Sequence, residues 1–140
     1  MNDEIQASSQ FESTDTILTF PTGLVGFPSL KSFRFFEPVD GYPFRFLQSV
    51  DSPDISFVCL DPVGFKPDYA VPLNGEDAQA LAIENPEDAL ILTIVVIPKD
   101  PKKMTTNLAG PLVINIKTLE GRQIVLNADK YPLQFPVLGG

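Results

Sequence analysis

Short apolar runs separated by proline and glycine make up most of this chain. In several runs apolar and polar residues alternate, which is the pattern of a strand that buries one face. The runs are rich in Phe, Val, Ile and Thr, which favour strands. The runs that we expect to form strands are 16–20, 32–37, 45–50, 55–60, 90–97, 112–117 and 123–126, with an additional short strand near 69–71. This pattern predicts a mainly β fold, a small antiparallel β-barrel or sandwich-like domain with one or two short helices.

The pattern in the last third of the chain predicts a β-hairpin. Ile114 and Ile116 lie two positions apart around the polar Asn115, and Ile124 and Leu126 repeat this spacing. Between these pairs, residues 119–122 include a glycine, the residue that turns accept most readily. We therefore expect two paired strands with the turn at 119–122.

The run 90–97 differs from the other predicted strands because nearly every position in it is apolar. Strands with this composition are buried on both faces or lie at the centre of a sheet. A charged residue at Ile94 or Val95 would then lose its hydration without gaining a partner. We expect such substitutions to damage the fold itself.

A helix is predicted to begin after Asn74, which is a suitable N-cap. Glu76 and Asp77 follow in the first turn, where the helix dipole favours carboxylates. Leu81 lies on the apolar side of the predicted helix, which ends before Pro86. That proline is expected to open a second short helical turn that leads into the following strand.

The length and charge of the chain limit the classes of partner. With 140 residues the chain fits one domain, which we place at 14–138 after a flexible segment 1–13. The net charge of −8 disfavours direct binding to nucleic acid or to an anionic membrane surface, and it favours a basic protein partner. The N-terminal residues lack the apolar core of a signal peptide, and no apolar run is long enough to span a bilayer. We therefore expect a cytoplasmic protein.

Candidate catalytic chemistry is sparse. The chain has no histidine, which removes the commonest general base and metal ligand. Cys59 is the single cysteine and lies in an apolar run, where we expect a buried, unreactive thiol. The adjacent carboxylates Glu76/Asp77 and Glu87/Asp88 are explained by predicted helix starts, and a small carboxylate-based enzyme is the alternative. We predict a protein that is not an enzyme and that uses no metal or cofactor.

Acidic and basic residues are unevenly distributed along the chain. Residues 51–88 contain nine acids and one base, whereas residues 99–130 contain six bases and three acids. The acidic region is either an ordinary solvated surface or a docking face for a basic partner. The two interpretations are compatible, because a surface that is hydrated in the free protein can become the rim of a complex.

Two loops are candidate docking segments. The loop 98–111 contains bases and prolines, and it is either a structural connection or a docking loop. Within it, Met104 either plugs a gap beneath the loop or contacts an adaptable partner surface. In the segment 22–27 we expect the glycines to adopt positive φ. Leu24, Phe27 and Leu30 are expected to fold onto the core, unless some of Leu24, Val25 and Phe27 stay exposed as an anchor for a partner.

Three ordered blocks of residues resemble the FliW family, the flagellar assembly factors of bacteria. The first block is FPTGLVGF at 20–27, followed by Leu30, Lys31 and Phe33. The second is LQSVDSPD at 47–54 with Phe57 and Val58, followed by PDY at 67–69. The third is Pro101, KMT at 103–105, NL at 107–108, Pro111, VIN at 113–115, KT at 117–118, Gly121 and Tyr131. The resemblance covers residues 14–131, and none of the blocks depends on a catalytic residue.

The resemblance implies a non-enzymatic protein that binds partners during flagellum assembly. Members of the family bind flagellin in a chaperone-like manner. They also bind the RNA-binding translational repressor CsrA and relieve its repression of flagellin synthesis. The implied mechanism is partner switching, in which accumulated flagellin occupies the protein and frees CsrA; an acidic interaction module with other partners is the alternative. The residues that we expect to contact partners are Glu76, Asp77, Glu84, Asp88, Lys103, Met104, Thr105 and Asn107.

Overall fold

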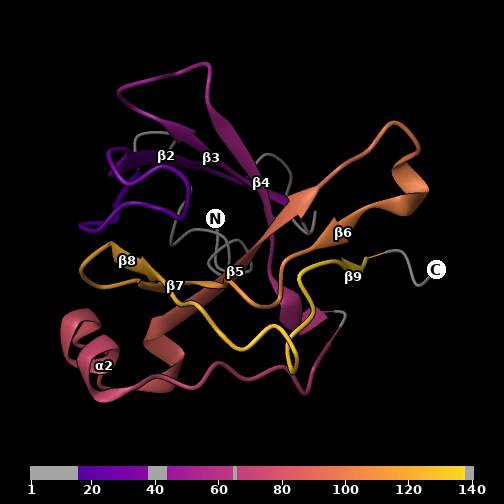
Figure 1. Ribbon diagram of the computed structural model, residues 1–140. Coiled ribbons are helices and arrows are strands. Elements are labelled where there is room, and N and C mark those ends of the chain that lie inside the picture. Colours follow the sequence, from indigo (N-terminus) through magenta and orange to yellow (C-terminus); the bar gives the residue numbers. More distant parts are fainter. Residues whose placement is uncertain (1–15, 38–43, 65, 138–140) are drawn as a thin grey trace, which may run out of the picture.

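The computed structural model describes residues 16–37, 44–64 and 66–137, and the predicted flexible segment 1–13 lies outside them. Most of the described elements are strands (Figure 1). The strands are β1 (Ile17–Thr19), β2 (Ser32–Phe36), β3 (Phe44–Ser49), β4 (Ser56–Leu60), β5 (Ala89–Val96), β6 (Thr105–Thr106), β7 (Leu112–Asn115), β8 (Glu120–Gln123) and β9 (Phe135–Pro136). The helical elements are the α-helix α2 (Gly75–Leu81) and the 3-10 helices η1 (Pro62–Gly64), η2 (Pro86–Asp88) and η3 (Pro101–Lys103).

Seven strands close into a barrel. Their hydrogen-bonded order is β4-β3-β2-β1-β8-β7-β5, and β5 pairs back with β4. These pairings are antiparallel except at β1 and β8, which meet in parallel at Thr19 and Glu120. β6 and β9 extend the sheet beyond the barrel, because β6 pairs with the end of β5 and β9 pairs with β6. The structure confirms the prediction of a mainly β, largely antiparallel fold, and of the two architectures expected it has the closed barrel.

β5 is the strand that closes the barrel. Residues 89–92 pair with β7, residues 93–95 pair with β4, and residues 95–96 pair with β6. The predicted central position of this strand is therefore confirmed. It is not buried along its whole length, however, because Val96 and Ile97 are exposed where the chain leaves the barrel and runs into the hairpin with β6.

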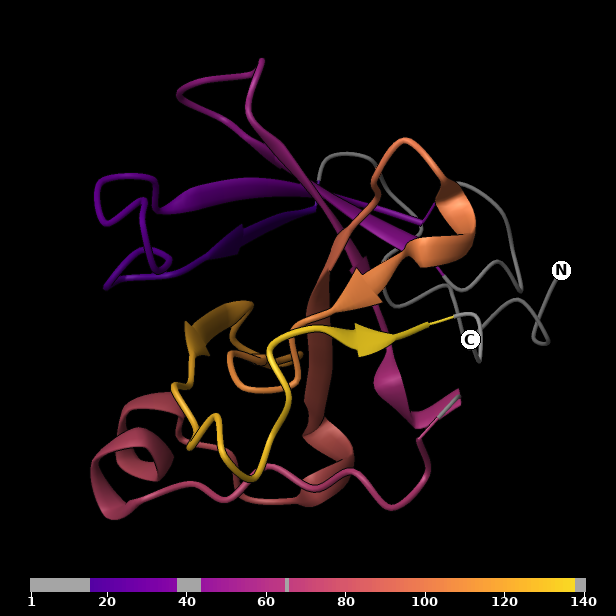
Figure 2. The ribbon, with the colours of Figure 1, turned by 45° about the vertical axis from the view of Figure 1, so that its right-hand side comes forward.

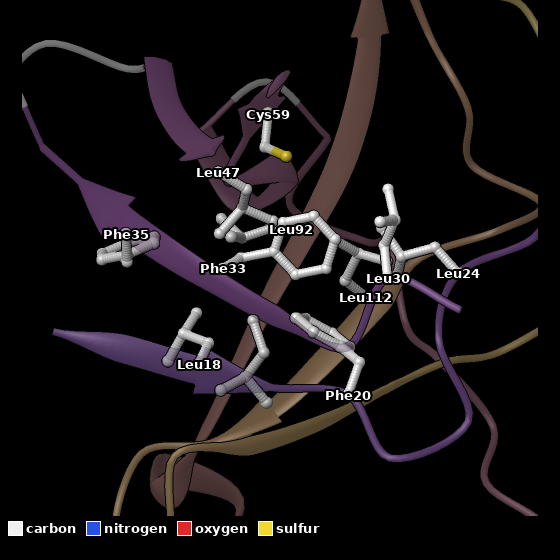
Figure 3. Close-up of a cluster of buried hydrophobic side chains, with 11 residues drawn as sticks. Leu18, Phe20, Leu24, Leu30, Phe33, Phe35, Leu47, Cys59, Leu92 and Leu112 are labelled. Atoms are coloured by element: carbon white, nitrogen blue, oxygen red, sulfur yellow. The ribbon is translucent and has the colours of Figure 1, made fainter. Parts of the chain in front are cut away.

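Aromatic and branched side chains from β1, β2, β3, β4, β5 and β7 fill the interior of the barrel (Figure 3). Phe20 and Phe33 meet edge to face, with ring centroids 5.7 Å apart. Cys59 is fully buried in the same cluster, and burial raises the pKa of its thiol to about 12. The prediction that this cysteine is buried is confirmed, and a thiol with such a pKa stays protonated at neutral pH, which disfavours reaction as a nucleophile.

The predicted hairpin exists, but its turn lies earlier in the chain than expected. The turn occupies residues 116–119, and β8 begins directly after it at Glu120. The predicted strand 123–126 is therefore wrong in its position along the chain. Asn115 shapes this turn: its Oδ1 accepts hydrogen bonds from the backbone N–H of Lys117 at 2.9 Å and of Thr118 at 3.4 Å.

Gly121 is required by packing and does not form the turn. It lies within β8, where a Cβ atom would come within 2.7 Å of Phe20 Cε2 and 2.8 Å of Ile114 Cγ1. No side chain fits at such distances without displacing the barrel core. The prediction that Gly121 belongs to the turn is therefore wrong, and the glycine is needed because the barrel core leaves no room for a side chain.

The predicted helix is confirmed as α2. Asn74 is its N-cap, with the side-chain oxygen accepting a hydrogen bond from the backbone N–H of Asp77 at 2.7 Å. The helix ends at Ala82, which adopts left-handed φ and ψ of 53° and 35°. Pro86 then opens η2, the second short helical turn that was expected before β5.

Residues 69–71 follow a turn at 67–68 and have no regular secondary structure, so the additional strand that was predicted there is wrong. The Tyr69 hydroxyl donates a hydrogen bond to the carbonyl oxygen of Leu108 at 2.6 Å. Its ring also meets the Tyr131 ring edge to face at 6.1 Å. Tyr69 therefore fastens the outer loops to one another without joining the sheet.

Substituting Val95 with Glu should destabilise the barrel, whereas the same change at Val96 should be tolerated. Val95 is 7% exposed and pairs with both β4 and β6, while Val96 is 62% exposed. An unpaired carboxylate at Val95 should lower the free energy of unfolding by about 3 kcal/mol or more, because its charge leaves water without a partner. Urea denaturation followed by circular dichroism measures both variants, and equal stabilities would contradict the assigned strand orientation.

Candidate protein-binding surfaces

Several of the acidic residues around α2 are paired within the molecule. Arg122 of β8 lies 3.7 Å from Glu76 and 3.5 Å from Asp77, measured between nitrogen and carboxylate oxygen. Lys117 of the β7–β8 turn lies 3.5 Å from Asp88. The side chains of Asp77 and Asp88 are largely buried, so these two carboxylates serve the fold as well as the surface charge. The base-rich part of the sequence thus partly neutralises its acid-rich part.

Other carboxylates beside α2 face solvent. Glu76 keeps 81% of its side chain exposed, so its long contact with Arg122 is weak. Glu84 and Glu87 are exposed and form no ion pair with any residue that the structure describes. We call these three residues the acidic face. It lies on α2 and on the chain that follows it, next to the start of β5.

An apolar groove of about 330 Å³ lies beside the acidic face. Its floor comes from β5 and β7, and its walls come from the chain before and after α2. The residues that line it are Val71, Leu73, Ile83, Glu84, Asn85, Pro86, Ala89, Ile91 and Val113. Apart from Glu84, none of these residues was predicted as part of a site. The available signal was weak, because isolated apolar residues beside Pro72 and Pro86 do not reveal which face of the barrel they cover.

The candidate loop 98–111 forms a hairpin tip beyond the barrel. Lys103 is exposed there at the end of η3, as expected of a contact residue. Met104 is buried against Leu60 and Val95, so the plugging interpretation holds for this side chain. Asn107 Oδ1 accepts a hydrogen bond from the backbone N–H of Ala109 at 2.9 Å, which holds the chain as it returns to the barrel.

The eight predicted contact residues do not form one surface. Glu76, Asp77, Glu84 and Asp88 belong to the α2 region. Lys103, Met104, Thr105 and Asn107 belong to the hairpin between β5 and β6 or to the chain just after it. Both ribbon views place α2 and the tip of this hairpin at opposite ends of the molecule (Figures 1 and 2). Their roles in binding stay predictions, and they concern two separate surfaces.

The segment 22–27 combines a buried and an exposed part. Gly23 and Gly26 have φ angles of 74° and 85°, which confirms the expected positive φ. Leu24 is buried in the barrel core, whereas Val25 is exposed and Phe27 is partly exposed against the ring of Phe57. An apolar tip therefore remains on this turn, as one of the two expectations for the segment allowed.

The described residues offer few groups for catalysis or metal binding. Among them, no three His, Cys, Asp or Glu side chains gather closely enough to hold a metal ion. The doublets Glu76/Asp77 and Glu87/Asp88 lie at the starts of helices, with three of these four carboxylates in ion pairs. None of the helices in the described part of the chain is long and apolar enough to cross a membrane.

Known proteins resemble this chain over nearly its whole length. A family model described as FliW protein matches residues 4–137. The flagellar assembly factor FliW of Natranaerobius thermophilus is 42% identical over 124 residues, which cover 88% of this chain and 82% of that protein. The protein of the same name from Clostridium botulinum (strain Langeland) is 34% identical over 137 residues, covering 98% and 95% of the two chains. A crystal structure of the flagellar assembly factor FliW has a TM-score of 0.83 at 27% identity and covers 92% of this chain and 90% of its own.

Alanine substitutions at Met104 and Lys103 should separate core packing from surface contact within the hairpin. Met104→Ala should lower the free energy of unfolding by about 2 kcal/mol or more, because it leaves a cavity beside Leu60 and Val95. Lys103→Ala should leave stability unchanged, because this side chain is exposed. Thermal and urea unfolding of the two variants make the comparison. A Met104→Ala protein as stable as the parent would contradict the assigned packing of this side chain against Leu60 and Val95.

Proposed function

Since this chain belongs to the FliW family of flagellar assembly factors, we propose that it is a non-enzymatic regulator that binds flagellin and the translational repressor CsrA in turn. Bound to flagellin it acts like a chaperone for the filament subunit. Bound to CsrA it relieves the repression of flagellin synthesis. The proposal assigns the protein to the cytoplasm, where both partners are made. Family membership over almost the entire chain is the observation that carries it.

The acidic face supports binding to CsrA. A repressor that binds RNA must present basic residues to the phosphate backbone. Glu84 and Glu87 are exposed carboxylates without an ion pair among the described residues, and Glu76 is largely exposed. The net charge of −8 adds a long-range attraction that raises the rate of encounter with a basic protein. We therefore assign the acidic face to CsrA.

The apolar groove supports binding to flagellin. The resemblance to the family implies flagellin as a partner, and the terminal segments of flagellin are amphipathic. A groove lined by branched side chains offers the apolar face of such a segment a place to leave water. Since Glu84 belongs to both the groove and the acidic face, the two assigned surfaces meet at this residue. Their contact gives a simple physical basis for mutual exclusion.

Affinity for CsrA should fall as the salt concentration rises, because counterions screen attraction between exposed charges. We expect the dissociation constant to increase by about fivefold or more between roughly 50 and 500 mM NaCl. The double variant Glu84→Gln/Glu87→Gln should bind more weakly and show a smaller salt dependence. Titration calorimetry or surface plasmon resonance measures both effects.

The matched control for this experiment is Asp51→Asn/Asp54→Asn. It removes the same charge from two exposed carboxylates in the turn between β3 and β4, far from α2 (Figure 1). Equal losses in the two double variants would mean that only net charge matters, and a dissociation constant independent of salt would contradict the electrostatic assignment.

Flagellin should displace CsrA from the protein. In size-exclusion chromatography with light scattering, an equimolar mixture of this protein and CsrA should give a complex that excess flagellin converts into a flagellin complex and free CsrA. The expected result follows from the shared residue Glu84, which two partners cannot contact in full at once. A stable assembly of all three proteins would contradict the switching mechanism and leave the two separate binding activities intact.

A further inference from the structure

The wall of the barrel between β5 and β7 is apolar on both faces. Leu92, Leu112 and Ile114 point into the barrel core. Ile91 and Val113, their neighbours along the two strands, belong to a second cluster on the outer face. A strand alternates its side chains between faces, so a wall with apolar residues on both sides needs a cover outside as well as a core inside.

α2 supplies only part of that outer cover. Leu81 is buried against Val113 and Ile124, which completes one half of the outer cluster. In the other half, the branched side chains are only partly buried, although they lie beside the buried Val113. These are Val71, Leu73, Ile83 and Ile91. The groove is therefore an incompletely covered extension of the outer cluster, with apolar area that a ligand would remove from water.

The rim of the groove is held in place without a ligand. The amide Nδ2 of Asn115 donates to the carbonyl oxygen of Leu81 at 2.9 Å and lies 3.4 Å from that of Ala82. Asn115 is itself buried in β7, so it fixes the end of α2 to the barrel wall. The chain that follows, with Ile83 and Glu84, consequently starts from a fixed position. A preformed groove binds without a large ordering cost.

The charge at the rim has one sign. Glu84 is exposed there, and no base is present among the nine lining residues. Lys117, the base of the neighbouring turn, is paired with Asp88. A ligand that brings a positive charge to the rim would therefore meet an acid that has no ion-pair partner among the described residues.

The groove favours a helix over an added strand. β7, which supplies the floor residue Val113, is hydrogen-bonded to β5 on one side and to β8 on the other. Pro72 lies in the chain between the lining residues Val71 and Leu73, and Pro86 is itself a lining residue. Proline has no backbone N–H to donate to an added strand. A segment that lies here must satisfy its own backbone groups, as a helix does.

We propose that this groove seats the apolar face of an amphipathic helical segment of flagellin, with a basic residue one helical turn from its apolar anchor paired to Glu84. The inference rests on the proposed binding of flagellin in this groove, and it adds the conformation of the bound segment and the chemistry that recognises it. Leu or Phe at the anchor enters the space between Leu73, Ile83 and Ile91. Lys or Arg three or four positions away then lies on the same side of the helix and reaches the rim.

Isoleucine methyl resonances test the site directly. The full chain, labelled at isoleucine δ1 methyl groups, is titrated with full-length flagellin. Ile83 and Ile91 line the groove, and the exposed Ile97 in the distant hairpin is the internal control. We expect shifts or broadening at Ile83 and Ile91 with little change at Ile97. Binding that leaves Ile83 and Ile91 unchanged would overturn the site and leave the proposed function standing.

A pair of matched charge reversals tests the role of Glu84. Glu84→Lys and Glu87→Lys change the net charge equally at two exposed positions, but only Glu84 lines the groove. We expect Glu84→Lys to weaken flagellin binding by about tenfold and Glu87→Lys to have a much smaller effect. Equal effects would overturn the assigned ion pair.

The same titration with CsrA separates the remaining outcomes. Shifts at Ile83 and Ile91 with CsrA, and none with flagellin, would overturn the identity of the occupant. Absence of any flagellin binding would refute the proposed function and the groove assignment together. A calorimetric measurement of the same samples establishes whether flagellin binds at all, so the two failures are distinguishable.

Discussion

The three pairings of β5 are the constraint on which the rest of the structure depends. Residues 93–95 close the barrel against β4, while residues 89–92 align β7 and so set the outer apolar wall. The Thr106 hydroxyl at the end of β6 donates a buried hydrogen bond to the Thr93 hydroxyl of β5 at 2.7 Å, which holds β6 against β5. The groove and the hairpin tip are therefore built on opposite ends of one strand. Their separation follows from its length and from the switch of its partner from β7 to β6.

Folding redistributes the charges that the sequence separates. Arg122 and Lys117 come from the base-rich part of the chain, yet they lie against Asp77 and Asp88 of the acid-rich part. Ion pairs of this kind contribute little to stability where water reaches them. Their main effect is to determine which carboxylates a partner can bind, because they leave only some of them available. Glu84 is one of these, and it is the one that also borders an apolar groove.

The sequence predicted most of the longer strands, the helix α2 with its cap and the buried Cys59, since each depends on local patterns of apolar and capping residues. It misplaced the β7–β8 turn, because Gly121 signals a turn in sequence and is needed for packing against Phe20 in the fold. β6 and β9 have two residues each, too few for any periodicity to appear. The groove was missed for a related reason: it is lined by segments far apart in the chain, and only the closure of the barrel brings Leu73, Ile91 and Val113 together.

The molecule has two parts that differ in how easily they open locally. One is the segment 71–88, which contains α2 and is attached through Asn115, and the other is the barrel. Residues 71–88 are held to the barrel by the packing of Leu81 and its neighbours in the outer cluster, by the hydrogen bonds from Asn115 and by the ion pairs of Arg122 and Lys117. Separating them breaks far fewer contacts than opening the seven-stranded ring, so amide protons here should exchange by a local route while the barrel stays intact. Heating would then abolish the recognition surface at a lower temperature than the fold. A ligand in the groove would bring these two temperatures closer together, because it would contact both the segment 71–88 and the barrel wall.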